Sequence, residues 1–125
     1  MSIDRNAVGW FEIYVQDMER ARSFYEKVFD ANLQHIPNPV LEMWAFPWDI
    51  TKPNCGGAIV KMEGVPSGPG GTMVYFSCED CAVQEALTAE NGGQVVRPKM
   101  SIGEFGFISL VKDPDGNMFG LHSHD

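Results

Sequence analysis

A repeated pattern of strand and helix constrains this chain more than any other feature. Residues 10–17 (WFEIYVQD) alternate in the manner of a strand as far as Asp17, and residues 18–29 (MERARSFYEKVF) follow with helical spacing. Aligning Asp17 with Asp80 lays this segment over a second one, MVYFSCED followed by CAVQEALTAENG. The shared pattern, length and turning point predict an internal duplication in which each Asp is the N-cap of a helix.

Each copy is predicted to continue with three strands. In the first copy these are residues 33–36, 40–48 and 56–62; in the second they are 94–97, 106–112 and 117–123, with Pro98 ending the first of these. The sequence EGVPSGPGG separates the copies. We therefore expect one domain over residues 1–125, with module one at about 8–63, a linker at about 64–71 and module two at about 72–123.

This order predicts an α+β fold in which two tandem strand-helix-three-strand (βαβββ) modules form a curved mixed sheet. The helices are expected on the outer face, which leaves a concave cup on the other side. The inward positions of the first helix are predicted to be Ala21, Phe24, Tyr25, Val28 and Phe29. Those of the second are predicted to be Val83, Ala86 and Leu87.

The composition excludes several classes of protein. The net charge is −8 and only nine Lys and Arg residues are present, scattered along the chain, so a nucleic-acid partner is not expected. No apolar run approaches a bilayer span, and the N-terminal residues lack the order of a secretory signal, which favours a cytoplasmic location and no membrane partner. The three cysteines, Cys55, Cys78 and Cys81, are interpreted as reduced thiols, and the CxxC pair among them as structural.

The duplicated modules, the VQD that opens the first helix, the FYEKVF within it and the closing DPDGNMFGL together resemble the vicinal oxygen chelate superfamily. This superfamily contains glyoxalase I, extradiol dioxygenases and bleomycin resistance proteins. The resemblance covers residues 10–122 and implies that the chain pairs with a second copy as a homodimer. It also implies that each curved sheet encloses a ligand.

Enzymes of this superfamily hold a divalent metal with four side chains, one from the opening strand and one from the closing strand of each module. The resemblance places these positions at Trp10, Met73, Gly120 and either Gly57 or Ile59. An indole, a thioether and non-donors cannot replace His, carboxylate or thiolate ligands. No cofactor is therefore predicted, and a divalent metal is expected only if its site is relocated.

By strand parity, the cup face carries aromatic and soft apolar side chains with a few polar groups, the composition of an organic ligand pocket. These predicted ligand-binding residues are Trp10, Glu12, Tyr14, Met73, Tyr75, Ser77, Met118 and His122, with Phe105 as a lid. Glu12 and His122 are the candidate catalytic residues, because a carboxylate in mid-strand must be solvated, paired or functional. Solvation in a water-filled cup and an ordinary polar role near the C-terminus are their alternative interpretations.

Three functions follow from these patterns. The first is a glyoxalase- or bleomycin-resistance-like protein that binds a small organic molecule in the cup without the usual metal. The second is a metal-dependent lyase, isomerase or dioxygenase with a relocated site, for which Glu12 and His122 would need a third donor such as Tyr75 or Cys55. The third is a non-catalytic dimeric structural or regulatory module. Whether the chain is an enzyme stays open at this point.

Overall fold

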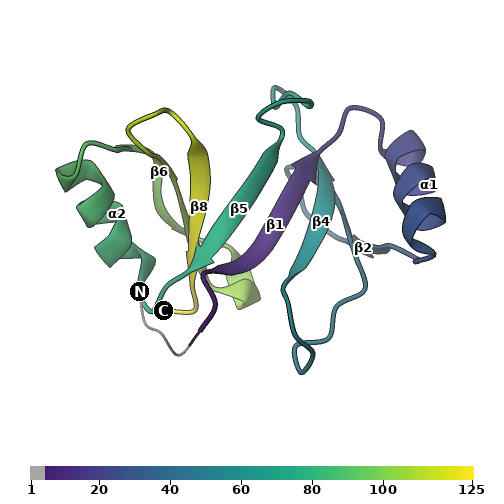
Figure 1. Cartoon of the computed structure of the whole chain (residues 1–125), viewed down its shortest axis with the longest axis horizontal. Helices are drawn as coiled ribbons and strands as arrows, with labels where there is room; N and C mark the ends of the chain where they lie inside the picture. Colours follow the sequence, from purple (N-terminus) through teal and green to yellow (C-terminus); the bar gives the residue numbers. More distant parts are fainter. Residues whose placement is uncertain (1–4) are drawn as a thin grey trace. The chain divides into compact units, whose positions relative to one another are not determined.

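A computed structural model describes residues 5–125, which divide into two units (Figure 1). One unit holds residues 10–73, and the other holds residues 5–9 together with 74–125. Each contains one copy of the repeat, so the predicted α+β fold of two βαβββ modules is confirmed. No helix in the described part of the chain is long and apolar enough to cross a membrane.

The first module pairs parallel and antiparallel strands in one sheet. Its elements are β1 (Val8–Tyr14), α1 (Met18–Phe29), β2 (Gln34–Ile36), β3 (Glu42–Ala45) and β4 (Gly56–Lys61). β1 runs parallel to β4, β4 is antiparallel to β3, and β3 is antiparallel to β2. In this register Glu12 lies opposite Ala58.

Helix α1 begins where the sequence predicts. The carboxylate of Asp17 accepts a hydrogen bond from the Arg20 N–H at 3.0 Å, which satisfies a donor that the first helical turn leaves unpaired. The helix covers the sheet face that carries Ile13, and Met18 packs there with the fully buried Ile59. The other face of β1, with Trp10, Glu12 and Tyr14, therefore points away from α1.

The predicted inward stripe of α1 is only partly correct. Ala21 and Tyr25 pack against the core, whereas Phe24, Val28 and Phe29 are each more than half exposed. The apolar stripe of α1 is therefore wider than the part of it that packs on the core. The helix consequently presents an apolar outer patch formed by these three residues.

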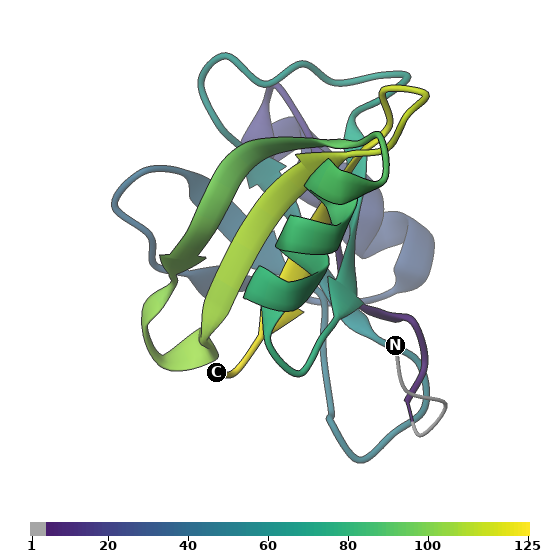
Figure 2. The same cartoon turned by 90° about the vertical axis from the view of Figure 1, so that its left-hand side faces the viewer.

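The second module repeats the order. Its elements are β5 (Thr72–Ser77), α2 (Cys81–Glu90), β6 (Gln94–Ser101), the short 3₁₀ helix η1 (Gly103–Phe105), β7 (Phe107–Lys112) and β8 (Met118–Ser123). β5 runs parallel to β8, β8 pairs with β7, and β7 pairs with β6. α2 lies across one face of this sheet (Figure 2) and buries Val111 and Leu121.

The prediction that Pro98 ends its strand is wrong, because β6 continues to Ser101. Proline has no N–H for the ladder and is therefore confined to edges and irregularities. β6 is the last strand of its sheet, and its pairing with β7 shifts register between Arg97 and Met100. Pro98 thus lies where the ladder is already interrupted.

The N-cap of helix α2 accepts one more side-chain hydrogen bond than the N-cap of α1. The Asp80 carboxylate accepts from the Ala82 N–H and from Lys99 Nζ, both at 2.9 Å. The Lys99 hydrogen bond is the main reason that the pKa of Asp80 lies below its ordinary value. The predicted inward residues Val83, Ala86 and Leu87 are all exposed, so their predicted burial in the core is wrong.

Candidate ligand site on the open sheet faces

A buried carboxylate lies in the middle of β1, on the sheet face of the first module that points away from α1. Glu12 is 7% exposed, although it is charged and lies in mid-strand. The Tyr14 hydroxyl donates to its Oε1 at 2.9 Å, and the Trp10 Nε1–H donates to its Oε2 at 3.3 Å. Because residues two apart on a strand share a face, β1 alone supplies an acid held between an indole and a phenol.

The phenol of Tyr14 is fixed as a hydrogen-bond donor. Burial raises its pKa well above the ordinary value of 10.0, and the charge of Glu12 and the hydrogen bond to it raise the pKa further. Loss of the Tyr14 proton would place two negative charges side by side in a buried place. Tyr14 is therefore an orienting group for Glu12 across the neutral pH range and is unsuited to act as a base.

Two indoles meet over a glycine next to this acid. The rings of Trp10 and Trp48 lie edge to face, with centroids 5.7 Å apart. A Cβ atom at Gly56 would come within 2.9 Å of the Trp48 ring and 3.1 Å of the Trp10 ring. The absence of a side chain at Gly56 is what lets both rings lie against β4, and Trp48 remains more than half exposed.

The open face of the second module repeats this ring-over-glycine arrangement. Tyr75 of β5 is paired with Gly120 of β8, and its ring occupies the space that a side chain at Gly120 would need. Ser77 is paired with His122 in the same register. Tyr75, Ser77 and His122 therefore lie on one face of this sheet, as the alternation of residues along the strands predicts.

The His122 ring is held by the segment predicted to be a lid. His122 Nε2 lies 2.6 Å from the backbone oxygen of Phe105, which requires Nε2 to carry the proton and donate it. Phe105 ends η1 and leaves about half of its side chain exposed. Its backbone thus orients His122, while the role of its ring as a lid stays a prediction.

The other predicted ligand-binding residues differ in accessibility. Met73 is buried in β5, whereas Met118 at the start of β8 is exposed. Trp10, Glu12 and Tyr14 are joined by hydrogen bonds, and Tyr75, Ser77, Met118 and His122 share a face of the second sheet. The structure brings each group together within its own module.

Comparison with known proteins identifies the family. The description "Glyoxalase/Bleomycin resistance protein/Dioxygenase superfamily" matches residues 7–121, which is nearly the whole chain. The chain belongs to this superfamily. The resemblance inferred from its repeated motifs is thereby confirmed.

Relatives of this superfamily member are distant. "Putative glyoxylase CFP32" of Mycobacterium bovis and of Mycobacterium tuberculosis is 28% identical over an alignment of 119 positions that covers 90% of this chain but only 44% of the relative. Hypothetical protein BH1468 from Bacillus halodurans has a similar fold, with a TM-score of 0.71 at 10% identity and 94% of each chain covered. A single-residue variant of Streptomyces coelicolor methylmalonyl-CoA epimerase, solved in complex with 2-nitronate-propionyl-CoA, gives a TM-score of 0.66 at 13% identity, covering 93% of this chain and 92% of that one.

The superfamily's metal positions do not fit a metal here. Gly120 has no side chain, and the Tyr75 ring fills the space where a carboxylate would project. The register also corrects the position in module one: Gly57 and Ile59 pair with Phe11 and Ile13 on the face under α1, so the counterpart of Gly120 is Ala58, opposite Glu12. An alanine offers no donor.

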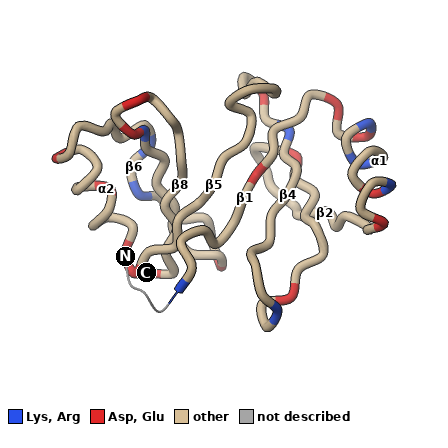
Figure 3. Tube along the Cα trace, viewed as in Figure 1, with Lys and Arg blue, Asp and Glu red and all other residues tan. Residues whose placement is uncertain are grey.

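A relocated set of ligands is not formed by the described side chains either. Across residues 5–125, no group of three or more His, Cys, Asp or Glu residues could hold a metal ion. Lys and Arg are spread over α1, β4, β6, β7 and the loops and do not gather on one element (Figure 3).

Two features escaped the sequence analysis. The first is the packing of Trp48 on Trp10, which depends on Gly56 lying next to Trp10 in the sheet, a pairing that periodicity does not reveal. The second is a cavity of about 610 Å³ on the helix-covered face of the second module. The signal for this cavity was present in the repeat, because aligning Asp17 with Asp80 places Thr88 where the first copy has Tyr25.

Proposed function

We propose that the chain binds a small organic molecule on the open face of the first module, around Glu12, without the superfamily's metal. The observation that carries this proposal is the buried Glu12 carboxylate held by Trp10 and Tyr14. Burial of a charged carboxylate costs free energy, and a fold that only needed a core would place an apolar residue there. Such sites are typical of binding and catalysis.

The side chains around Glu12 favour a ligand that combines an aromatic or apolar body with a cationic group. The indoles of Trp10 and Trp48 offer ring faces and edges, and a cation next to an indole and a carboxylate gains from both. The net charge of −8 attracts cations at long range. The structure of a relative with a small organic ligand, the Streptomyces coelicolor epimerase, agrees with small-molecule binding by this fold.

Calorimetric titration with benzyltrimethylammonium tests this proposal, with phenylacetate as the anionic counterpart. We expect the cation to bind and phenylacetate not to bind. Glu12→Gln should weaken binding of the cation at least tenfold, which is about 1.4 kcal/mol. Glu104→Gln removes one carboxylate from the exposed helix η1 and is the matched control, with unchanged affinity expected.

Elemental analysis of the purified protein completes the test. The proposal expects no stoichiometric transition metal. Stoichiometric Zn, Ni or Fe that disappears in Glu12→Gln would contradict it and would favour the metal-dependent lyase, isomerase or dioxygenase. Equal binding of both titrants, or an affinity for the cation that Glu12→Gln leaves unchanged, would also contradict it.

Homodimer formation is a second part of the proposal. The outer patch of α1, formed by Phe24, Val28 and Phe29, offers an apolar surface of the kind that a second copy would cover. Light scattering during gel filtration should show a dimer that Phe24→Asp converts to a monomer. A monomeric wild-type chain would overturn this part and leave ligand binding untouched.

A further inference from the structure

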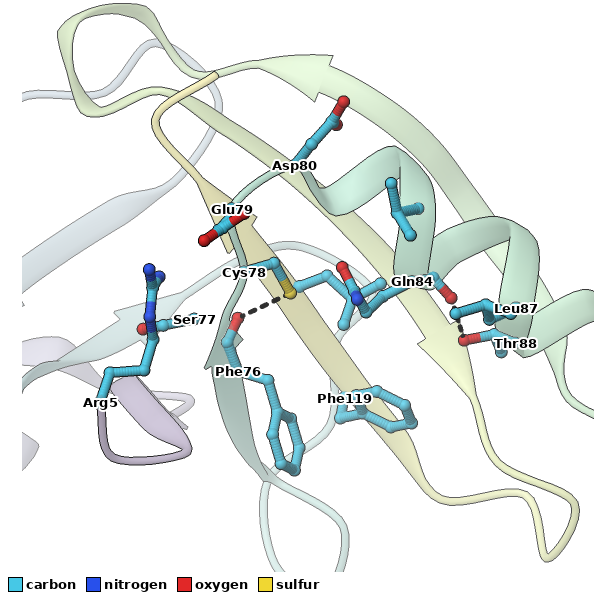
Figure 4. Close-up of a pocket in the computed structure, with 12 residues that line it drawn as sticks. Arg5, Phe76, Ser77, Cys78, Glu79, Asp80, Gln84, Leu87, Thr88 and Phe119 are labelled. Atoms are coloured by element: carbon cyan, nitrogen blue, oxygen red, sulfur yellow. Dashed lines mark hydrogen bonds between the residues drawn. The ribbon is translucent and has the colours of Figure 1, made fainter. Parts of the chain in front are cut away.

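The cavity of about 610 Å³ in the second module lies between α2 and the strands β5 and β8 (Figure 4). Phe76 and Phe119 form part of its wall, with ring centroids 5.3 Å apart and an interplanar angle of 73°. Val83 and Leu87 of α2 line it on the other side and are 52% and 47% exposed. This volume lies within the range of small-molecule sites.

The cavity exists because one side chain of the repeat is small. In the first module Tyr25 stands at the position of Thr88, and its ring packs edge to face on Phe46 at 5.7 Å between centroids. The corresponding space there is reduced to about 370 Å³. Thr88 does not fill its space, since its hydroxyl turns back to donate to the Gln84 carbonyl at 2.7 Å.

The chemistry of the lining indicates what the cavity would hold. Its rim carries both signs of charge, Arg5 on one side and Glu79 and Asp80 on the other, and the Asp80 carboxylate is already paired with Lys99, so no net charge is favoured. Inside, the Cys78 thiol is directed to the Phe76 carbonyl at 3.7 Å, and burial is the main cause that raises the pKa of this thiol. The interior is thus neutral and apolar with two aromatic edges.

We propose that this cavity is a second binding site, for a neutral, largely apolar molecule that carries an aromatic ring. Such a molecule would stack against Phe76 and Phe119 and remove Val83 and Leu87 from water, which is the main source of favourable free energy. The site does not depend on the one around Glu12, because its walls belong to the sheet face under α2. The two sites succeed or fail separately.

The fluorescent probe N-phenyl-1-naphthylamine, which is neutral and aromatic, tests this site. We expect saturable binding of one probe per chain at micromolar concentration. Thr88→Tyr gives module two the ring that fills module one, and it should weaken binding at least tenfold. Thr51→Tyr adds the same ring to an exposed loop and should leave binding unchanged, as should Glu12→Gln.

A measurement on the wild-type chain keeps the proposal testable if Thr88→Tyr does not fold. The bound probe should slow alkylation of Cys78 at pH 9 by iodoacetamide several-fold, with the rate at Cys55 unchanged. Probe binding that survives Thr88→Tyr, or equal protection of both cysteines, would overturn the site. The wild-type chain could instead be an oligomer that does not bind the probe and that Thr88→Tyr dissociates. This result would assign the cavity to an interface with a second copy and would also overturn the proposal.

Discussion

The two modules share a backbone pattern but differ where the helix meets the sheet. In the first, Phe11, Tyr25 and Phe46 bring aromatic rings into this interface, with centroid separations of 5.9 Å and 5.7 Å to Phe46. In the second, Thr88 replaces the central ring and a cavity results. The comparison teaches that the repeat determines the elements and their order, while single side chains decide whether the same interface is a core or a pocket.

The open faces differ in a related way. Both use a glycine on a middle strand to accommodate a ring, Gly56 under two indoles and Gly120 under Tyr75. Only the first module adds a buried acid, Glu12, at the position where the second has Tyr75. One module therefore offers a charged site on its open face, and the other offers an apolar cavity on its helix-covered face.

The largest expected change in the free energy of unfolding is at the buried core residues that correspond to each other on β4 and β8. Ile59→Ala should lower the free energy of unfolding by about 3–4 kcal/mol, because Ile59 is fully buried in the filled interface. Leu121→Ala should cost only about 2 kcal/mol, since Leu121 already borders the cavity. Urea unfolding measures both values, and equal costs would refute the difference in packing between the modules.

Opening the filled interface is the next test. Tyr25→Thr gives module one the residue of module two and should cost about 2–3 kcal/mol, because Tyr25 loses its contacts with Phe46 and Phe29. Ile50→Thr is the control, with a cost below about 1 kcal/mol because this side chain is 85% exposed and lies outside the proposed dimer surface. Urea unfolding measures both variants. A Tyr25→Thr variant as stable as the control would show that Tyr25 does not fill the interface.

The local parts of this structure were readable from the sequence. Asp17 and Asp80 are N-caps because a carboxylate before an apolar helical stripe has a local meaning, and the turn at residues 113–116 follows from DPDG, with Gly116 at φ 86. The alternation in β1 placed Trp10, Glu12 and Tyr14 on one face. Each of these predictions depends on residues only a few positions apart.

The predictions that failed depend on contacts between distant segments. Choosing Gly57 or Ile59 in place of Ala58 was a one-residue error in register, which periodicity cannot correct without the pairing of β1 with β4. The exposure of Phe24 and Val28 depends on which part of α1 packs on the core, and distant segments form that core. The continuation of β6 past Pro98 depends on β6 being an edge strand.

Substitutions at the two helix N-caps are expected to change stability less than those in the core. Asp17→Ala should cost about 1 kcal/mol as the loss of an N-cap. Asp80→Ala should lower the melting temperature further, because Asp80 also accepts from Lys99. Since the pKa of Asp80 is lowered in the folded state, this extra stabilisation is present above pH 3.8 and is lost as the pH falls through the folded value.

Thermal unfolding followed by circular dichroism between pH 2 and pH 7 measures the difference between these two variants. It should be largest at neutral pH and low salt, because an exposed ion pair is screened by salt. A difference that persists unchanged at pH 2 would show that Lys99 does not contribute through its charge.

The smallest effect is expected at Cys78, which stands where the first module has Val15. Cys78→Val should change the free energy of unfolding by less than about 0.5 kcal/mol, because a half-buried thiol packs as a small apolar group and its hydrogen bond to the Phe76 carbonyl is long, at 3.7 Å. Cys81→Val is the control: this thiol is fully buried at the start of α2, and the added methyl group should cost about 1–3 kcal/mol. A large loss at Cys78 together with none at Cys81 would contradict the structural interpretation of the CxxC pair. A smaller loss of stability at Cys78 than at Cys81 would instead be consistent with Cys78 being a residue of the cavity wall that valine, the residue of the other module, can replace.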